Sequence, residues 1–129
     1  MNEKLHELRF NNEKAICFFS KLAAYTVGPM ELKELLDENN VKLIDVRCVE
    51  DYQTAHIPTA ISIPKSELSN NLDKLSKDQI NIVYCYNEQC RLAVKAALLL
   101  AEYGYPVMML LGGFQTWVED FRFATESRQ

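Results

Sequence analysis

The stretch from Asn81 to Ala97 decides the fold, and it reads NIVYCYNEQCRLAVKAA. It begins with a short apolar run, Ile82-Val83-Tyr84, whose β-branched and aromatic residues predict a buried strand. Residues 92–102 are rich in Ala and Leu and are followed by Gly104, which predicts a helix with a glycine C-cap. Cys85 opens the polar loop between the two, at the carboxyl end of the strand and facing the helix. Ligands bind at that edge of open α/β sheets, where loop amides and the helix dipole favour an anion.

Composition and charge limit the class of protein. With 129 residues, 48% hydrophobic and 25% charged, the chain is expected to form one domain with its own core. A net charge of −4 without any basic run argues against a nucleic-acid partner. The longest apolar runs, 15–19 and 94–101, are too short to span a bilayer, and residues 1–20 lack a secretory pattern. We therefore expect a cytoplasmic protein with no nucleic-acid and no membrane partner.

The cysteines do not indicate a disulfide framework or a metal site. The chain has four of them, Cys17, Cys48, Cys85 and Cys90, and a domain of this length needs no staples, so free thiols are expected. The sequence contains no CxxC pair, and its two histidines are isolated from one another. Neither a metal nor a cofactor is therefore predicted.

Along the rest of the chain, short apolar runs alternate with amphipathic ones. Strands are predicted at 25–27, 41–46, 60–63, 82–84 and 107–111. Helices are predicted at 2–24, with a break near Asn11-Asn12, and at 30–39, 50–55, 66–75, 92–102 and 114–118. This alternation predicts an α/β fold with a five-stranded parallel sheet flanked by helices on both faces. We expect residues 1–24 to form a helical extension packed on the domain, which comprises residues 25–129.

Several strings of residues are, in addition, similar to one known domain. The first half of the resemblance consists of Leu43-Ile44-Asp45-Val46-Arg47, Asp51-Tyr52, His56-Ile57-Pro58, Ala60 and Ile63-Pro64. The second half consists of Val83-Tyr84-Cys85, Ala96-Ala97, Leu99, Gly104-Tyr105, Gly112-Gly113-Phe114 and Trp117. Over about 25–118 the chain thus resembles rhodanese-like domains. The resemblance implies sulfurtransferase activity through a cysteine persulfide, with Cys85 as the catalytic residue.

The chain departs from the common rhodanese pattern in two places. Ala55 and Thr59 stand where these domains usually have Gly, which affects local backbone detail. The loop after Cys85 is longer than in common single-domain rhodaneses, has no Gly, and contains Cys90. In this it resembles a subgroup with a Cys-x4-Cys loop and an N-terminal helical extension. The extension here carries Phe18-Phe19, which we consider a candidate contact for a partner or a homodimer.

The loop is predicted to bind the sulfur donor. Substrate-binding residues are expected to be the six that follow Cys85, namely Tyr86, Asn87, Glu88, Gln89, Cys90 and Arg91. Their amides would surround the sulfur, and together with Arg91 they are expected to lower the pKa of the Cys85 thiol. Glu88 acts against this, both for a thiolate and for a thiosulfate dianion. The donor is therefore expected to be a small anion or a persulfide-carrying protein, and the acceptor a thiol or cyanide.

Other interpretations of the same residues stay open at this point. Cys85 and Arg91 satisfy Cys-x5-Arg, the spacing of phosphatase and arsenate-reductase loops, although Tyr84 replaces the usual His and Glu88 suits a phosphate poorly. A non-catalytic module for protein binding or redox switching is the alternative from another class. Cys90 is either a resolving thiol that forms a disulfide with Cys85 or a small apolar residue that opens the helix.

Three further polar residues are assigned to support. Arg47 is a candidate support for the site, and Asp45 is expected to be structural, because a strand-end Asp and Arg commonly satisfy backbone groups. His56 is expected to brace a turn.

Overall fold

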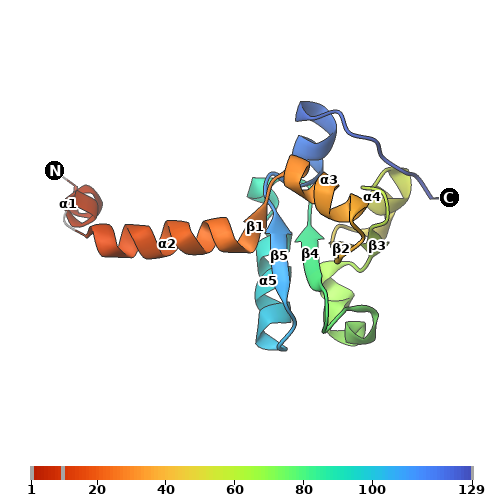
Figure 1. Cartoon of the computed structure of the whole chain (residues 1–129), viewed down its shortest axis with the longest axis horizontal. Helices are drawn as coiled ribbons and strands as arrows, with labels where there is room; N and C mark the ends of the chain where they lie inside the picture. The colour runs from red at the N-terminus through yellow and green to blue at the C-terminus, as the bar shows by residue number, and fades with distance from the viewer. Residues whose placement is uncertain (1, 10, 129) are drawn as a thin grey trace.

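The computed structural model describes residues 2–9 and 11–128, and its centre is a five-stranded parallel sheet (Figure 1). The strands are β1 (Thr26–Val27), β2 (Val41–Asp45), β3 (Ile61–Ser62), β4 (Ile80–Tyr84) and β5 (Val107–Leu110). They lie in the order β1-β5-β4-β2-β3, and every neighbouring pair is parallel. The α/β fold predicted from the alternation of strands and helices is therefore confirmed, and β4 is its central strand.

Helices cover both faces of the sheet, and the side chains of β4 alternate between them. Ile82 and Tyr84 enter the core on the face covered by α3 (Pro29–Asp37), α4 (Val49–Thr54) and α6 (Gly113–Gln115), which η4 (Thr116–Asp120) continues as a turn of π-helix. Val83 and Cys85 enter the core on the face covered by α5 (Leu92–Glu102). Cys85 therefore belongs to the α5 layer by strand alternation alone.

The predicted end of α5 is confirmed. Gly104 follows the helix with φ of 84°, and its amide donates to the carbonyl of Ala101 at 3.0 Å. A residue with a Cβ is strained in this left-handed conformation, so the glycine stops the helix and lets the chain enter β5.

The predicted helix at 66–75 is wrong. The segment forms two short 3-10 turns instead, η1 (Lys65–Asn70) and η2 (Leu72–Lys74). The Asn71 side chain donates to the carbonyl of Glu67 at 2.7 Å, so it competes for a group that a continuous helix would use. Leu68 is nevertheless fully buried, which shows that the apolar spacing served the core although the helix type differed.

The expectation that the N-terminal extension packs on the domain is also wrong. It forms α1 (Glu3–Arg9) and α2 (Asn12–Tyr25), and the predicted break lies between them, with Asn11 accepting a hydrogen bond from the Lys14 amide. Figure 1 shows α2 leaving the body beside β1 and extending away from it. None of the residues of α2, all of which the structure describes, is buried. Within residues 2–9 and 11–128, no helix has both the length and the apolar character required to cross a membrane.

Thr59 occupies a backbone conformation that suits glycine, and we expect Thr59→Gly to stabilise the protein. Its φ is 74°, and its side chain is exposed. Glycine removes the strain of a β-branched residue at positive φ in the folded state. This gain exceeds the cost of the extra conformational entropy that glycine gives to the unfolded chain, so the free energy of unfolding should rise by about 0.5–1 kcal/mol. Urea unfolding measures this. Thr26→Gly is the control: its φ is −127°, and the same change there should lower stability.

Candidate active site

Cys85 lies where the sequence predicted it, directly after the last residue of the central strand. Val46, the residue that follows β2, donates its amide to the carbonyl of Tyr84 at 3.0 Å, so the two neighbouring strands end at the same level. Cys85 is only 3% exposed, and its thiol donates to the carbonyl oxygen of Asn87 at 3.5 Å. The sulfur is thus held at the carboxyl edge of the sheet, beneath its own loop.

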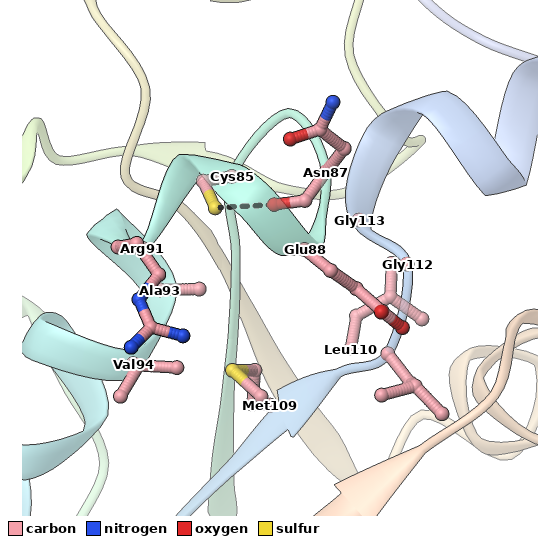
Figure 2. Close-up of a pocket in the computed structure, with 11 residues that line it drawn as sticks. Cys85, Asn87, Glu88, Arg91, Ala93, Val94, Met109, Leu110, Gly112 and Gly113 are labelled. Atoms are coloured by element: carbon pink, nitrogen blue, oxygen red, sulfur yellow. Dashed lines mark hydrogen bonds between the residues drawn. The ribbon is translucent and has the colours of Figure 1, made fainter.

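A pocket of about 160 Å³ opens beside the Cys85 sulfur (Figure 2). Much of its wall is apolar and comes from the start of α5 and the end of β5, namely Ala93, Val94, Met109, Leu110 and Leu111. Two opposite charges complete it, because Glu88 and Arg91 line the pocket from different sides of Cys85. The space is large enough for a small sulfur compound, and its charges do not favour anions alone.

Of the residues predicted to bind substrate, the structure brings some into the pocket and leaves others out. Asn87, Glu88 and Arg91 line it together with Cys85. Tyr86 and Gln89 are exposed and are not among the lining residues, and neither is the half-buried Cys90. The apolar wall from β5 was missed, although the rule that parallel strands end at one edge could have indicated that Leu111 and Gly112 would lie near Cys85.

Asn87 organises the loop through its backbone and its side chain. Its carbonyl oxygen accepts from the Cys85 sulfur and from the Cys90 amide, the latter at 3.2 Å. Its side-chain oxygen accepts from the same Cys90 amide at 3.1 Å, which caps the short turn η3 (Glu88–Cys90). Its side-chain amide donates to Gln115 at 3.2 Å. One asparagine therefore ties the two cysteines to each other and the loop to α6.

Backbone contacts with α6 hold the start of the loop. The amides of Phe114 and Gln115 donate to the carbonyls of Cys85 and Tyr86 at 2.9 and 2.8 Å. A Cβ on Gly113 would lie 2.6 Å from the Cys85 oxygen and 2.7 Å from the Tyr86 oxygen. Glycine is required at position 113 because only a residue without a side chain permits this approach.

The loop ends in a left-handed residue, although it contains no glycine. Arg91 has φ of 68° and ψ of −10° and connects η3 to α5. A non-glycine residue in this region costs on the order of 1 kcal/mol and is held there by its surroundings. The conformation lets the chain turn directly into α5, so that the first amides of the helix face the cysteines.

The two thiols of the loop have opposite electrostatic environments. Burial raises the pKa of Cys85 to about 11, and the Cys90 sulfur adds to this, while the amides of Ala93 and Leu92 act in the opposite direction. Burial also disfavours the Cys90 thiolate, but the amides of Leu92 and Tyr86, the Cys85 thiol and Arg47 together lower the pKa of Cys90. The expected lowering of the Cys85 pKa by loop amides and Arg91 is therefore wrong, since burial outweighs them.

The order of alkylation should report this difference. With a pKa of about 11, roughly one Cys85 in 10⁴ is a thiolate at pH 7, so iodoacetamide should modify Cys90 first. The rate at which Cys85 is labelled should rise steadily as the pH increases toward 11, because a raised pKa shifts formation of the Cys85 thiolate to higher pH. Peptide mass spectrometry after timed labelling measures both rates. Faster labelling of Cys85 than of Cys90 at pH 7 would contradict the assignment.

A buried ion pair supports the site from the neighbouring strand. Arg47 donates to Asp45 at 2.8 Å and to the carbonyl of Ala55 at 2.7 Å, and its guanidinium lies 4.2 Å from the ring centre of Phe114. Tyr84 donates its hydroxyl to Asp45 at 2.9 Å and accepts from the amide of Ile57 at 3.1 Å. Arg47 thus links Asp45, at the end of β2, to Phe114 of α6, and neither Asp45 nor Arg47 is among the residues that line the pocket.

The remaining candidates lie away from the pocket. The ring of His56 stacks on Tyr52 at 3.7 Å and lies 2.7 Å from the Tyr52 carbonyl, and its backbone pairs with Glu126. This agrees with a role in bracing a turn. Cys17 and Cys48 are exposed, and neither lines the pocket.

The family model described as the rhodanese-like domain matches residues 28–120. The chain belongs to the rhodanese-like family. Among curated relatives, the thiosulfate sulfurtransferase GlpE of Coxiella burnetii is 32% identical over 92 residues, which are 70% of this chain and 84% of that protein. An HTH-type transcriptional regulator of Mycobacterium tuberculosis, Rv0324, is 37% identical over 87 residues, but the chain spans only 38% of its length.

Solved structures show the same fold. The BH2092 protein of Bacillus halodurans is 32% identical and matches with a TM-score of 0.81 over 91% of this chain and 87% of its own. A coverage of 91% extends beyond residues 28–120. A full-length protein from Lactobacillus plantarum has a TM-score of 0.80 over 90% of this rhodanese-like chain at 18% identity, which shows the fold alone.

Proposed function

We propose that this rhodanese-like protein is a sulfurtransferase that carries a sulfane sulfur on Cys85. The observation that supports this most directly is the position of Cys85, at the end of the central strand and in the wall of a pocket. The similarity to GlpE, whose name states thiosulfate sulfurtransferase, supports the reaction class. In the proposed reaction the Cys85 sulfur attacks the outer sulfur of the donor, and a persulfide forms.

Loading requires the Cys85 thiolate. The Cys85 thiol loses its proton to solvent before its sulfur attacks, and because burial raises the pKa of Cys85 to about 11, the loading rate is expected to rise with pH. With thiosulfate, the sulfur–sulfur bond breaks and sulfite leaves with the electron pair. The resulting persulfide gives its outer sulfur to an acceptor thiol or to cyanide. The proposed compartment is the cytoplasm, where low-molecular-weight thiols serve as acceptors.

The charges of the pocket bear on the donor. Glu88 repels a thiosulfate dianion and Arg91 attracts it, so a persulfide-carrying donor stays within the proposal beside the small anion. The same carboxylate argues against the phosphatase and arsenate-reductase alternative, because a phosphate would lie beside Glu88 as well as Arg91.

Sulfite release tests the proposal. Reduced wild-type protein mixed with excess thiosulfate should release about one sulfite per chain in a single turnover, and Cys85→Ser should release only background. Cys48→Ser is the matched control, since Cys48 is exposed and does not line the pocket, and it should behave as the wild type. Glutathione persulfide serves as a second donor. Absence of Cys85-dependent uptake from both donors would overturn the proposal.

A further inference from the structure

The cysteine pair of the loop meets at a single peptide oxygen. The carbonyl oxygen of Asn87 lies 3.5 Å from the Cys85 sulfur and 3.2 Å from the Cys90 amide nitrogen. The two thiols are also near enough for each to shift the pKa of the other, with that of Cys85 raised and that of Cys90 lowered. Cys90 therefore faces the sulfur that would carry the persulfide, from the side of the loop rather than from the pocket.

The surroundings of Cys90 favour an attacking sulfur. The amides of Leu92 and Tyr86 point to it, and the positive charge of Arg47 acts on it. Its own amide is fixed by two acceptors on Asn87, so its backbone is held toward Cys85. A cysteine that merely filled space at the start of α5 would need none of these groups.

We propose that Cys90 resolves the Cys85 persulfide, so that the loop releases hydrogen sulfide and closes as a Cys85–Cys90 disulfide. This inference rests on the proposed function, because it requires a persulfide at Cys85. It adds a product, sulfide, and a requirement for an external dithiol to the simple transfer of sulfur.

The chemistry of this step balances. The Cys90 thiolate attacks the inner sulfur of the Cys85 persulfide, a bond forms between the two cysteine sulfurs, and the bond to the outer sulfur breaks. The outer sulfur leaves with the electron pair as hydrosulfide. It is reduced to sulfide, and the cysteine pair is oxidised to the disulfide. A dithiol, of the class that a thioredoxin-like protein or dithiothreitol represents, then reduces the disulfide and restores the loop.

The short loop makes the closure feasible. A disulfide requires Cα atoms about 4.4–6.8 Å apart, and the contacts through Asn87 already hold both residues around one atom. Closing the bond requires the inner sulfur of Cys85 to move away from the Asn87 oxygen, which the free thiol contacts. Asn87 can keep its hold on the Cys90 amide while this happens.

Three variants and two readouts test the inference. Reduced wild type, Cys90→Ser and Cys85→Ser are mixed with thiosulfate, or with glutathione persulfide, without added thiol, and intact mass and free sulfide are measured. We expect Cys90→Ser to gain one sulfur atom and keep it, with no sulfide released. The wild type should release about one sulfide per chain and lose two hydrogens, and addition of dithiothreitol should allow further release of sulfide. Cys90→Ala serves as a second variant in case the serine disturbs folding.

The possible failures are distinguishable. If no variant takes up sulfur, the proposed function fails. If the wild type keeps its added sulfur as Cys90→Ser does, the proposed function stands and the resolving role of Cys90 is overturned. If the wild type loads sulfur while Cys90→Ser and Cys90→Ala are folded but take up no sulfur, Cys90 acts in loading only. This result also overturns the resolving role of Cys90.

A separate observation concerns α2, which carries large apolar side chains in solvent. Ile16 is 67% exposed, Phe19 60% and Leu22 39%, and Phe18 adds a further ring beside them. A shallow apolar groove runs along the same face between Asn12 and Ala23. Burying such side chains stabilises an assembly by about 1.5–3 kcal/mol each, so an uncovered helix of this kind indicates an interface.

The pattern of α2 is complementary to itself. In an antiparallel pair centred on Phe19, the large Ile16 faces Leu22 of the second helix and the small Ala15 faces Ala23. Lys14, Cys17 and Lys21 lie on the side of α2 opposite to Phe19, so no two like charges face each other across the pair. A two-fold dimer requires a surface that matches its own copy in this way.

We also propose that α2 forms an antiparallel homodimer with α2 of a second copy of this chain. Sedimentation equilibrium of the full chain tests it. The wild type should be a dimer at micromolar concentration, and Phe19→Glu should be a monomer with unchanged thermal unfolding, since Phe19 contacts no core. Cys17→Glu is the matched control, because it places the same charge on the opposite side of the helix and should remain a dimer.

Two results would overturn this proposal. One is a wild type that remains a monomer at tens of micromolar. If that monomer binds anionic lipid vesicles and Phe19→Glu abolishes the binding, the apolar face of α2 binds a lipid surface instead. The other is a dimer that persists in Phe19→Glu, which would place the interface elsewhere.

Discussion

Replacing Gly113 by alanine is expected to lower the free energy of unfolding by about 3 kcal/mol and to abolish sulfur loading. Gly113 has φ of 65°, which disfavours any L side chain, and a Cβ there would meet the backbone oxygens of Cys85 and Tyr86 at 2.6 and 2.7 Å. Backbone oxygens cannot rotate away as a flexible side chain can, so the loop itself must move. The hydrogen bonds from Phe114 and Gln115 that position Cys85 would then be lost. Urea unfolding and sulfite release measure the two effects.

Gly104→Ala separates conformational strain from the close approach at Gly113. Gly104 also has a positive φ, 84°, but nothing lies within 4 Å of its added Cβ. Its substitution should cost only about 1 kcal/mol and leave sulfite release unchanged. Equal losses for the two variants would show that Gly113 is required for its backbone conformation alone, and that its contact with the Cys85 loop has no special role.

Local patterns in the sequence were sufficient to place Cys85. Strand and helix periods depend on neighbouring residues, so the run Ile82-Val83-Tyr84, the helix after it and Gly104 could be assigned without a structure. Parallel topology then fixed the edge at which the loop lies. Gly112-Gly113 is a local signal of the same kind, because a glycine pair after a strand permits close backbone approach.

Features that depend on distant residues could not be predicted in this way. The pKa of Cys85 is set by how deeply the folded chain buries the thiol, and burial is a property of the whole layer under α5. The apolar wall from Met109 and Leu110 enters the site across the sheet, with no local signal near Cys85. Likewise, the amphipathic pattern of α2 shows that the helix has an apolar face but does not show whether its own domain covers that face.

The second large effect is expected for Asp45→Asn, which should destabilise the protein by about 3 kcal/mol. Asp45 is fully buried and accepts hydrogen bonds from the Arg47 backbone amide, the Arg47 guanidinium and the Tyr84 hydroxyl. Asparagine keeps the shape but removes the negative charge, so the buried guanidinium of Arg47 is left without a counter-charge. Removing one partner of a buried ion pair lowers the free energy of unfolding far more than removing one partner of an exposed pair does. Urea unfolding measures the loss.

Asp37→Asn is the control, because Asp37 pairs with Lys33 at 3.9 Å on the surface and its loss should change stability by no more than about 0.5 kcal/mol. The effect of Asp45→Asn on catalysis should be small for the molecules that remain folded, since Asp45 does not line the pocket and bonds to Arg47 and Tyr84 rather than to either loop cysteine. Sulfite release measured well below the unfolding midpoint tests this. If Asp45→Asn keeps wild-type stability but releases no sulfite, Asp45 takes part in the chemistry of sulfur transfer. If Asp45→Asn loses stability but still releases sulfite, the Asp45–Arg47 pair has a structural role, which is to stabilise the part of the fold that holds the cysteine loop.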